Sequence, residues 1–280
     1  MNLLLLVCTL VCVLCVFAAD KNKPHHHQGE LEPFDGHHIP YEITKEEAET
    51  LASGGHVTKI DRHGKSGRGT IIQDVAAPPH ICMDRIRDLK NYSKMVANLR
   101  SIEIESENTD ADGNTEILSK WTVGISLVSF SYFLKLNYHA AYNTYTWHLD
   151  YSKASDMDDN IGHWQALPHP TKGPEYSRVM YSSEVKLFNW MPEFVVTFLT
   201  KGALVSSTTW VKKESEKVVT SGKTIDGGPT VSPPFNSPDL STCFKTDGDG
   251  NENYITDCAE KIAVKEEETT SEEGSSEEEL

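Results

Sequence analysis

The sequence has few positive charges for its length: 26 lysines and arginines stand against 42 aspartates and glutamates, giving a formal net charge of −16. A chain with this balance has no basic stripe to hold a phosphate backbone, so nucleic acid is excluded as a partner. Eight acidic residues lie between Glu266 and Glu279, among serines and threonines with almost no apolar side chains. We therefore expect residues 265–280 to be a solvated, disordered tail.

After its first residues the sequence contains no apolar run long enough to cross a bilayer, which excludes a protein with several membrane spans. The one long apolar run, Leu3–Phe17, is short for a span and is followed by the small residues Ala18 and Ala19. This pattern is typical of a secretory signal peptide, and an uncleaved signal anchor is the alternative. We predict a signal peptide at residues 1–19 and a protein of the secretory pathway, secreted or held in the ER lumen.

Cysteine is scarce, with six residues, and three of them fall within the predicted signal peptide. Of the remaining three, Cys243 and Cys258 flank a polar, glycine-containing loop. In an oxidising compartment this spacing predicts a disulfide, which for so short a loop contributes about 3 kcal/mol. Cys82 lies in an apolar helical stretch, so we expect a buried small side chain rather than a nucleophile.

No catalytic signature is complete. The segment His63-Gly64-Lys65-Ser66 ends like a phosphate-binding loop, but the position of the first required glycine holds Lys59. His148 and Asp150 share one face of a predicted strand, as a base and its orienting carboxylate would. Both are also typical residues of a solvent-exposed face, which is the interpretation we favour. We predict no catalytic residue and no cofactor.

Two further segments have a metal-binding composition without a metal-binding pattern. The histidines at 25–27 and 37–38 lie in a lead-in that is rich in proline and glycine and offers no fixed geometry. Asp247–Asn253 places oxygen-bearing side chains at alternate positions, as calcium loops do, but the sixth and twelfth EF-hand positions hold Glu252 and Cys258. We interpret this segment as a turn, with calcium binding as the alternative, and predict no metal site.

Signals for regular structure concentrate in the middle of the chain, and no internal repeat is present. Thr44 and Glu47 form a capping box that predicts a short helix before the main domain. The polar segment His56–Gly69 is interpreted as a linker or an edge excursion. After the signal peptide we predict an N-terminal extension (20–68), a main domain (69–217), a loop-rich extension with the predicted disulfide (218–264) and the acidic tail (265–280).

Within the main domain, alternating apolar and polar residues predict one short strand at Thr70–Val75 and then two short helices, His80–Leu89 and Tyr92–Leu99. A long, one-sidedly apolar helix is predicted at Pro192–Lys213, with proline at its first position. This order predicts an α+β fold in which a curved antiparallel sheet wraps around the C-terminal helix. Six strands are predicted between the short and the long helices: Ser101–Glu107, Glu116–Val123, Phe130–Tyr138, Tyr145–Tyr151, Gly162–Leu167 and Ser177–Phe188.

Several local patterns between Arg68 and Lys217 resemble one known family. They are Val75-Ala-Ala-Pro78, Ile86–Tyr92, Met95-Val96, Asp159–Trp164, Arg178–Leu187 and Trp190-Met-Pro192. Together with the element order, they resemble the START/polyketide cyclase (SRPBCC) superfamily, and most closely its coenzyme Q-binding branch. The resemblance implies a helix-grip fold with an apolar cavity that carries lipids, quinones, polyketides or hormones. Some members are enzymes, but no invariant catalytic set accompanies the pattern.

Large side chains crowd the predicted inward faces of the strands and of the C-terminal helix. Pockets for small molecules are mostly apolar with a few polar groups, and these side chains fit such a wall. Plain core packing is the alternative. We predict that the cavity is lined by Trp121, Phe130, Tyr132, Leu134, Trp147, Trp164, Tyr181, Phe194 and Phe198.

These observations predict a protein that binds or transports an apolar small molecule, such as a lipid, an isoprenoid quinone or a polyketide-like compound. Transient membrane contact would allow the ligand to exchange. A cyclase or dehydratase that acts in the same cavity is the second hypothesis, and an interaction module that works through its acidic tail is the third.

One modification motif accompanies the predicted secretory route. Asn91-Tyr92-Ser93 is an N-glycosylation sequon. It falls between the two predicted short helices, so we predict a glycan at Asn91.

Overall fold

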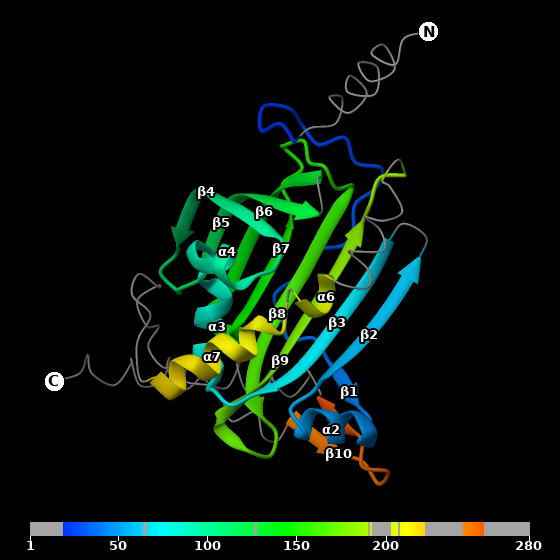
Figure 1. Ribbon diagram of the computed structural model, residues 1–280, viewed down its shortest axis with the longest axis vertical. Helices are drawn as coiled ribbons and strands as arrows, with labels where there is room; N and C mark the ends of the chain where they lie inside the picture. The colour runs from blue at the N-terminus through cyan, green and yellow to red at the C-terminus, as the bar shows by residue number, and fades with distance from the viewer. Residues whose placement is uncertain are drawn as a thin grey trace, which may run out of the picture.

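In the computed structural model, residues 19–63, 66–125, 128–189, 191, 203–206, 208–221 and 243–254 are described (Figure 1). The main sheet contains β2 (His56–His63), β3 (Ser66–Val75), β4 (Leu99–Thr109), β5 (Thr115–Ile125), β6 (Val128–His139), β7 (Thr144–Leu149), β8 (Asp159–His169) and β9 (Gly173–Lys186). These eight strands are antiparallel, in the order β2-β3-β9-β8-β7-β6-β5-β4. The α+β class and the antiparallel sheet are confirmed, and the arrangement is consistent with a helix-grip fold.

The six strands expected after the short helices are all present because their alternation is strong. Along β6, the inward-facing Tyr132, Leu134 and Leu136 are buried. The turn from β4 to β5 is tight: the Asp110 carboxylate accepts the backbone N–H of Asn114, and Gly113 has a φ of 83°. Glycine adopts this left-handed conformation without a steric clash. The resulting tight turn fixes the register of the hairpin.

Strand β2 is the main departure from the predicted domain layout. The segment interpreted as a linker or an edge excursion is an edge strand, which pairs along its whole length with β3, from His56 opposite Gln73 to His63 opposite Ser66. Its charged and polar residues conceal the alternation, but such residues suit an edge strand, whose outer side is open to water. The sheet therefore begins before Gly69, the predicted start of the main domain.

Short helices cover one face of the sheet: α3 (Pro79–Arg87), η2 (Leu89–Asn91), α4 (Tyr92–Met95), α6 (Ala203–Ser206) and α7 (Trp210–Ser221) (Figure 1). The helices α3 and α7 pack against each other and against the sheet. Cys82, Ile86 and Val211 are completely buried at this junction, where each larger apolar side chain contributes about 1.5–3 kcal/mol. Burial raises the pKa of the Cys82 thiol to about 11, and the predicted buried cysteine is confirmed.

The long helix predicted at Pro192–Lys213 is not seen among the described residues. Residues 192–202 lie outside them, and the rest of the segment forms the short helix α6 and the start of α7, which runs on to Ser221. Between the two helices, the hydroxyl of Thr208 donates to the Leu204 carbonyl and that of Thr209 to the Val205 carbonyl. Such side-chain bonds compete with helical backbone bonds, which explains why the apolar spacing overestimated the helix.

A second, three-stranded sheet is formed by β1 (Tyr41–Ile43), β11 (Glu252–Tyr254) and β10 (Phe244–Thr246), in that order. Helix α2 (Lys45–Ala52) follows β1 and starts at the predicted capping box of Thr44 and Glu47. The predicted turn lies between β10 and β11, where the Asp247 carboxylate accepts the backbone N–H of Asn251. Cys243 is buried beside this sheet. Its predicted partner, Cys258, lies outside the described residues, so the disulfide stays a prediction.

A buried ion cluster joins the two sheets. Asp74 accepts hydrogen bonds from Arg178 Nε and His169 Nε2, both at 2.8 Å, and Arg178 also contacts Glu252 of β11. Burial alone would raise the pKa of Asp74, but the hydrogen bonds from His169 and Arg178 hold it well below its usual range. Strand β11 is therefore tied to the main sheet.

Residues 20–40 form an N-terminal strap across the sheet face opposite the helices. The lead-in expected to lack fixed geometry is held by named contacts, which corrects that interpretation. Gln165 on β8 exchanges two hydrogen bonds with the Ile39 backbone, and the Asp159 carboxylate accepts the backbone N–H of Leu31. His25 and His38 are each only 7% exposed. Polar side chains on the outer face of β7 and β8 thus pair with strap backbone, which the sequence pattern did not indicate.

Candidate ligand cavity

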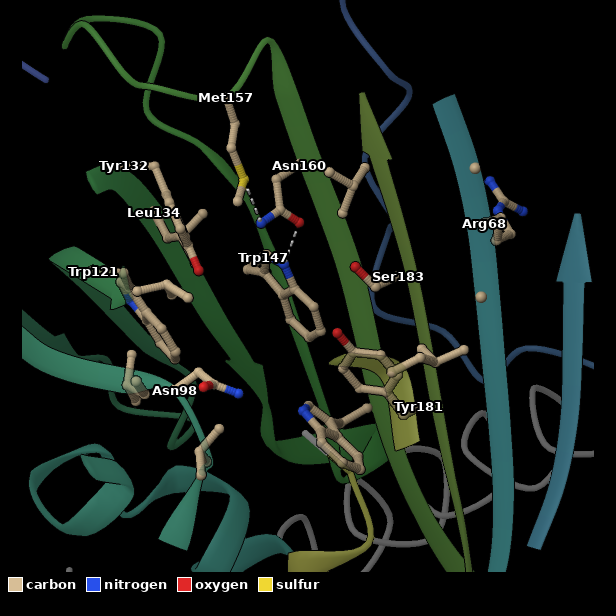
Figure 2. A pocket seen from close by; sticks show the side chains of 18 of the residues that line it. Arg68, Asn98, Trp121, Tyr132, Leu134, Trp147, Met157, Asn160, Tyr181 and Ser183 are labelled. Carbon is tan, nitrogen blue, oxygen red and sulfur yellow. Dashed lines mark hydrogen bonds between the residues drawn. The ribbon is translucent and has the colours of Figure 1, made fainter. Parts of the chain in front are cut away.

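A cavity of about 200 Å³ lies between the inner face of the sheet and the elements that cover it (Figure 2). Strands β5 to β9 supply about half of its wall. The loop from α4 to β4 forms another part, and Leu204 of α6 packs over the inner face of β3. A cavity at this place is what the alternating strands and the covering helices predict.

Six of the nine predicted lining residues are on this wall: Trp121, Tyr132, Leu134, Trp147, Trp164 and Tyr181. Phe130 is 5% exposed and belongs to the hydrophobic core, but it does not line the cavity. Phe194 and Phe198 lie outside the described residues. The structure brings the six side chains together from strands β5 to β9. Their role in binding stays a prediction.

Other wall residues were missed by the sequence prediction because they are polar or lie at the ends of elements. Met157 comes from the end of the β7–β8 connection, Asn160 is at the start of β8, and Asn98 precedes β4 with a φ of 65°. A non-glycine residue in this left-handed region is uncommon, and asparagine is among the residues that tolerate it best. Gly67 and Gly69 on β3 also line the cavity, and the missing side chain of Gly69 lets Leu204 pack closely against the strand.

Hydrogen bonds hold two of the three wall indoles in place. Trp147 Nε1 donates to Asn160 Oδ1 at 3.1 Å, and Asn160 Nδ2 contacts the Met157 sulfur at 3.9 Å (Figure 2). Trp121 Nε1 donates to Ser119 Oγ at 3.0 Å. These bonds fix the orientation of rings whose flat faces form the wall, so this part of the cavity is pre-shaped.

The wall has little capacity for acid–base chemistry. Among the described residues that line it, there is no histidine, aspartate, glutamate, lysine or cysteine. Burial raises the pKa of the Tyr132 and Tyr181 hydroxyls, so both stay protonated at neutral pH. Arg62 and Arg68 are the charged residues of this wall, and both are exposed. The described part of the wall can bind a ligand by contact and hydrogen bonding, and none of its described side chains is suited to act as a general base at neutral pH.

His148 and Asp150, considered in the sequence analysis as a base and its orienting carboxylate, each contact other groups in the structure. His148 Nδ1 lies 2.9 Å from the Leu149 carbonyl, while the Asp150 carboxylate accepts the N–H and hydroxyl of Ser152. In the part of the chain that is described, no three histidine, cysteine, aspartate or glutamate side chains are grouped to hold a metal ion.

The predicted glycosylation site is engaged within the fold. Asn91 Nδ2 donates to both carboxylate oxygens of Asp88, at 3.0 and 2.9 Å. A glycan on this nitrogen would replace that contact, so modification would have to precede the folding of this segment. Glycosylation of Asn91 stays a prediction.

Residues 1–18, which contain most of the predicted signal peptide, lie outside the described part of the chain. Among the helices that are described, none has the length and apolar character needed to cross a membrane. The secretory location stays a prediction.

No protein-family model and no curated protein matches this sequence. Among solved structures, the chain is similar to the Zhui aromatase/cyclase from Streptomyces sp. R1128, with 12% identity and a TM-score of 0.47 over 57% of this chain and 99% of that one. It is also similar to a START superfamily protein from Mycobacterium smegmatis, with 16% identity and a TM-score of 0.43 over 58% of this chain and 98% of the other. Neither description mentions coenzyme Q, so the likeness to that branch stays a prediction.

Proposed function

We propose that this protein binds a compact apolar small molecule in the cavity and releases it without chemical change. The wall supports this proposal because aromatic and aliphatic side chains dominate it and a few hydrogen bonds fix their positions. Each square ångström of apolar ligand surface moved from water to this wall contributes about 25 cal/mol. Sequestration is therefore the activity that the described residues favour.

The size of the cavity limits the ligand. Pockets for drug-sized molecules typically occupy about 300–1,000 Å³, whereas this one has about 200 Å³, the liquid volume of about seven water molecules. A one- or two-ring compound fits that space, whereas a lipid with two long chains or a quinone with a long isoprenoid tail would extend outside. Within the predicted ligand classes, the volume favours a small ring compound of the polyketide-like kind.

We further propose that the cavity rim contacts membranes transiently when ligand is exchanged. Ile60 on β2 lines the cavity and is 48% exposed, which is unusual for a large apolar side chain at a pocket edge. Insertion of Ile60 into the apolar layer would cover it. Flotation with phosphatidylcholine vesicles should recover the native protein more than Ile60→Glu, and equal recovery would contradict this contact.

The enzyme hypothesis, a cyclase or dehydratase, is the weaker alternative because these reactions need a group that moves protons. The described wall has only tyrosine hydroxyls with raised pKa values for that purpose. If ligand bound in the cavity were recovered chemically altered, the carrier proposal would be replaced by the enzyme.

The proposal is tested by solvent extraction of the purified protein followed by mass spectrometry, and by uptake of small fluorescent apolar probes. Val123→Trp places a bulky ring on the wall and should reduce probe affinity at least tenfold. Lys120→Trp makes the same addition on the outward face of β5 and should leave affinity unchanged. The carrier proposal fails if the native protein yields no apolar molecule and takes up no probe, or if both variants bind like the native protein.

A further inference from the structure

Three tryptophan and four tyrosine side chains line the cavity, and three of these seven side chains donate hydrogen bonds to the protein. Trp147 and Trp121 donate to Asn160 and Ser119, and the Tyr92 hydroxyl donates to the Ile86 carbonyl. The other four wall groups differ among themselves. The Tyr181 hydroxyl interacts with Ser183, and the Tyr145 hydroxyl has no partner but is completely enclosed by protein. The Tyr132 hydroxyl and the Trp164 indole N–H make no hydrogen bond with any described residue, and neither atom is completely enclosed.

The polar atoms of Tyr132 and Trp164 can be reached from the cavity. Tyr132 is 7% exposed and Trp164 is 4% exposed. Figure 2 shows the Tyr132 side chain reaching from β6 toward the centre of the cavity, where its hydroxyl approaches the region of Trp147. Although both residues are buried, neither polar atom is among the described atoms that are both fully enclosed and unpaired, so each stays accessible from the cavity. A hydrogen-bonding ligand in the cavity would supply the missing partner.

The chemistry of the two groups specifies that partner. An indole N–H can only donate, so the atom opposite Trp164 must be an acceptor. The Tyr132 hydroxyl can donate to an acceptor or receive a bond from a hydroxyl. Carbonyl and hydroxyl oxygens on a small ring compound meet both requirements.

The charge of the wall further narrows the ligand. Its interior has no cation among the described residues, and Arg68 at the rim is already 2.8 Å from the Glu184 carboxylate. A charged ligand in this space would lose its hydration without gaining an opposite charge, at high cost. An uncharged molecule avoids that cost.

We propose that the cavity selects an uncharged ring compound of one or two rings with two oxygen functions, of which a carbonyl oxygen accepts from Trp164 Nε1 and a second oxygen bonds the Tyr132 hydroxyl. This inference rests on the proposed carrier function and adds the chemical class of the cargo. The proposed ligand class is thereby distinguished from hydrocarbons and from fatty acids of the same volume.

The test uses four probes of matched size: tetralin, 1-tetralone, 7-hydroxy-1-tetralone and the anion 1-naphthoate. One hydrogen bond contributes about 0.5–1.5 kcal/mol net, so the native protein should bind 1-tetralone about two- to tenfold more tightly than tetralin. The hydroxylated ketone should gain a similar factor again, and 1-naphthoate should bind most weakly. Isothermal titration calorimetry gives each affinity.

Two variants identify the residue that makes each hydrogen bond to the ligand. Comparing the affinities of two probes within one variant, as a ratio, removes the effect of the altered side-chain shape on both. Tyr132→Phe should abolish the gain from the second oxygen, and Trp164→Phe should abolish the tetralone-to-tetralin ratio. Tyr176→Phe is the control, because Tyr176 is 39% exposed and lies outside the cavity wall, and it should leave both ratios unchanged. Since the Tyr132 hydroxyl has no protein partner to lose, Tyr132→Phe should also melt at or above the native temperature.

A spectroscopic readout identifies the acceptor independently of affinity. The five tryptophans give five indole N–H signals in a proton–nitrogen correlation spectrum, and the one lost in Trp164→Phe should shift downfield with 1-tetralone and not with tetralin. Equal affinity of the native protein for tetralin and both ketones would overturn the inference and leave the carrier function standing. If no uncharged probe binds, both this inference and the proposed carrier function fail.

Discussion

At Gly162 the absence of a side chain shapes the cavity. A Cβ atom added there would overlap the ring of Trp147, which lies across β8 at this position. Glycine within a strand weakens the strand, and it often marks a place where another group approaches closely. Here the approaching group is an indole that lines the cavity and whose Nε1 is fixed by Asn160.

Gly162→Ala should therefore displace Trp147 and break its bond to Asn160. Overpacking of this kind typically costs about 1–3 kcal/mol, and urea unfolding should show a loss of that size together with weaker binding of 1-tetralone. Gly248→Ala is the control, because no atom lies within 4 Å of a Cβ placed there. Equal stability of the two variants would show that Trp147 moves aside without cost.

At the scale of single elements, helix α2 depends on its first turn. Thr44 Oγ1 accepts the Glu47 backbone N–H at 3.2 Å, and the Glu47 carboxylate accepts the Thr44 N–H at 2.9 Å. The helix buries Leu51 against Val57 of the edge strand β2 and Ile72 of β3. The N-cap thus supports the outer end of the main sheet.

Thr44→Ala should lower the free energy of unfolding by about 1 kcal/mol, the usual effect of losing an N-cap side chain. Thr50→Ala on the same helix removes only a hydroxyl that donates to the Glu46 carbonyl, so it should be neutral or slightly stabilising because alanine favours helix. Chemical denaturation of both variants measures the difference. A larger loss for Thr50→Ala would contradict the capping role.

Elements with strong alternation were predictable from the sequence, and those decided by long-range contacts were not. Apolar and polar residues alternate along strand β6, so its inward and outward faces can be predicted, whereas β2 is recognisable only through its pairing with β3. The helix near Thr208 was overestimated because spacing does not reveal hydroxyl bonds to backbone carbonyls. In the cavity, six of the large side chains were predicted, whereas Asn98 gains its position from loop geometry and Asn160 from the pairing at the start of β8.

At the scale of the whole molecule, buried histidines tie the N-terminal strap to the sheet. His38 Nε2 donates to the Tyr142 carbonyl at 2.5 Å, and His163 Nε2 donates to the His37 carbonyl at 3.1 Å. Burial lowers the pKa of His38 to about 4 and that of His163 to about 3. Both imidazoles are neutral in the folded protein at neutral pH.

These pKa values predict loss of stability in acid. Between about pH 6.5 and the lowered values, the unfolded chain binds protons that the folded chain does not, so the free energy of unfolding falls as pH decreases. At pH 5 each histidine should account for a loss of about 2 kcal/mol relative to pH 7.5. Burial raises the pKa of Asp156 to about 6, which acts in the opposite direction by about 1 kcal/mol, so the histidines dominate.

Urea unfolding at pH 7.5 and pH 5 measures the effect, with hydrogen exchange to locate it. Amides of residues 25–39 should lose protection first. The glutamine in His163→Gln cannot bind a proton, so this variant should show a smaller difference in the free energy of unfolding between pH 7.5 and pH 5. An unchanged difference in that variant would remove His163 from the explanation.

The N-terminal strap is joined to the second sheet by a hydrogen bond from the Tyr254 hydroxyl to His38 Nδ1 at 2.8 Å. The strap and the C-terminal sheet consequently depend on each other for their position, although 216 residues separate these partners along the chain. A minimal fragment trimmed to residues 69–217 would lose β2, the strap and both ends of this contact. It would leave Gln165, Thr144 and His163 uncovered, so ligand measurements on such a fragment would describe a different molecule.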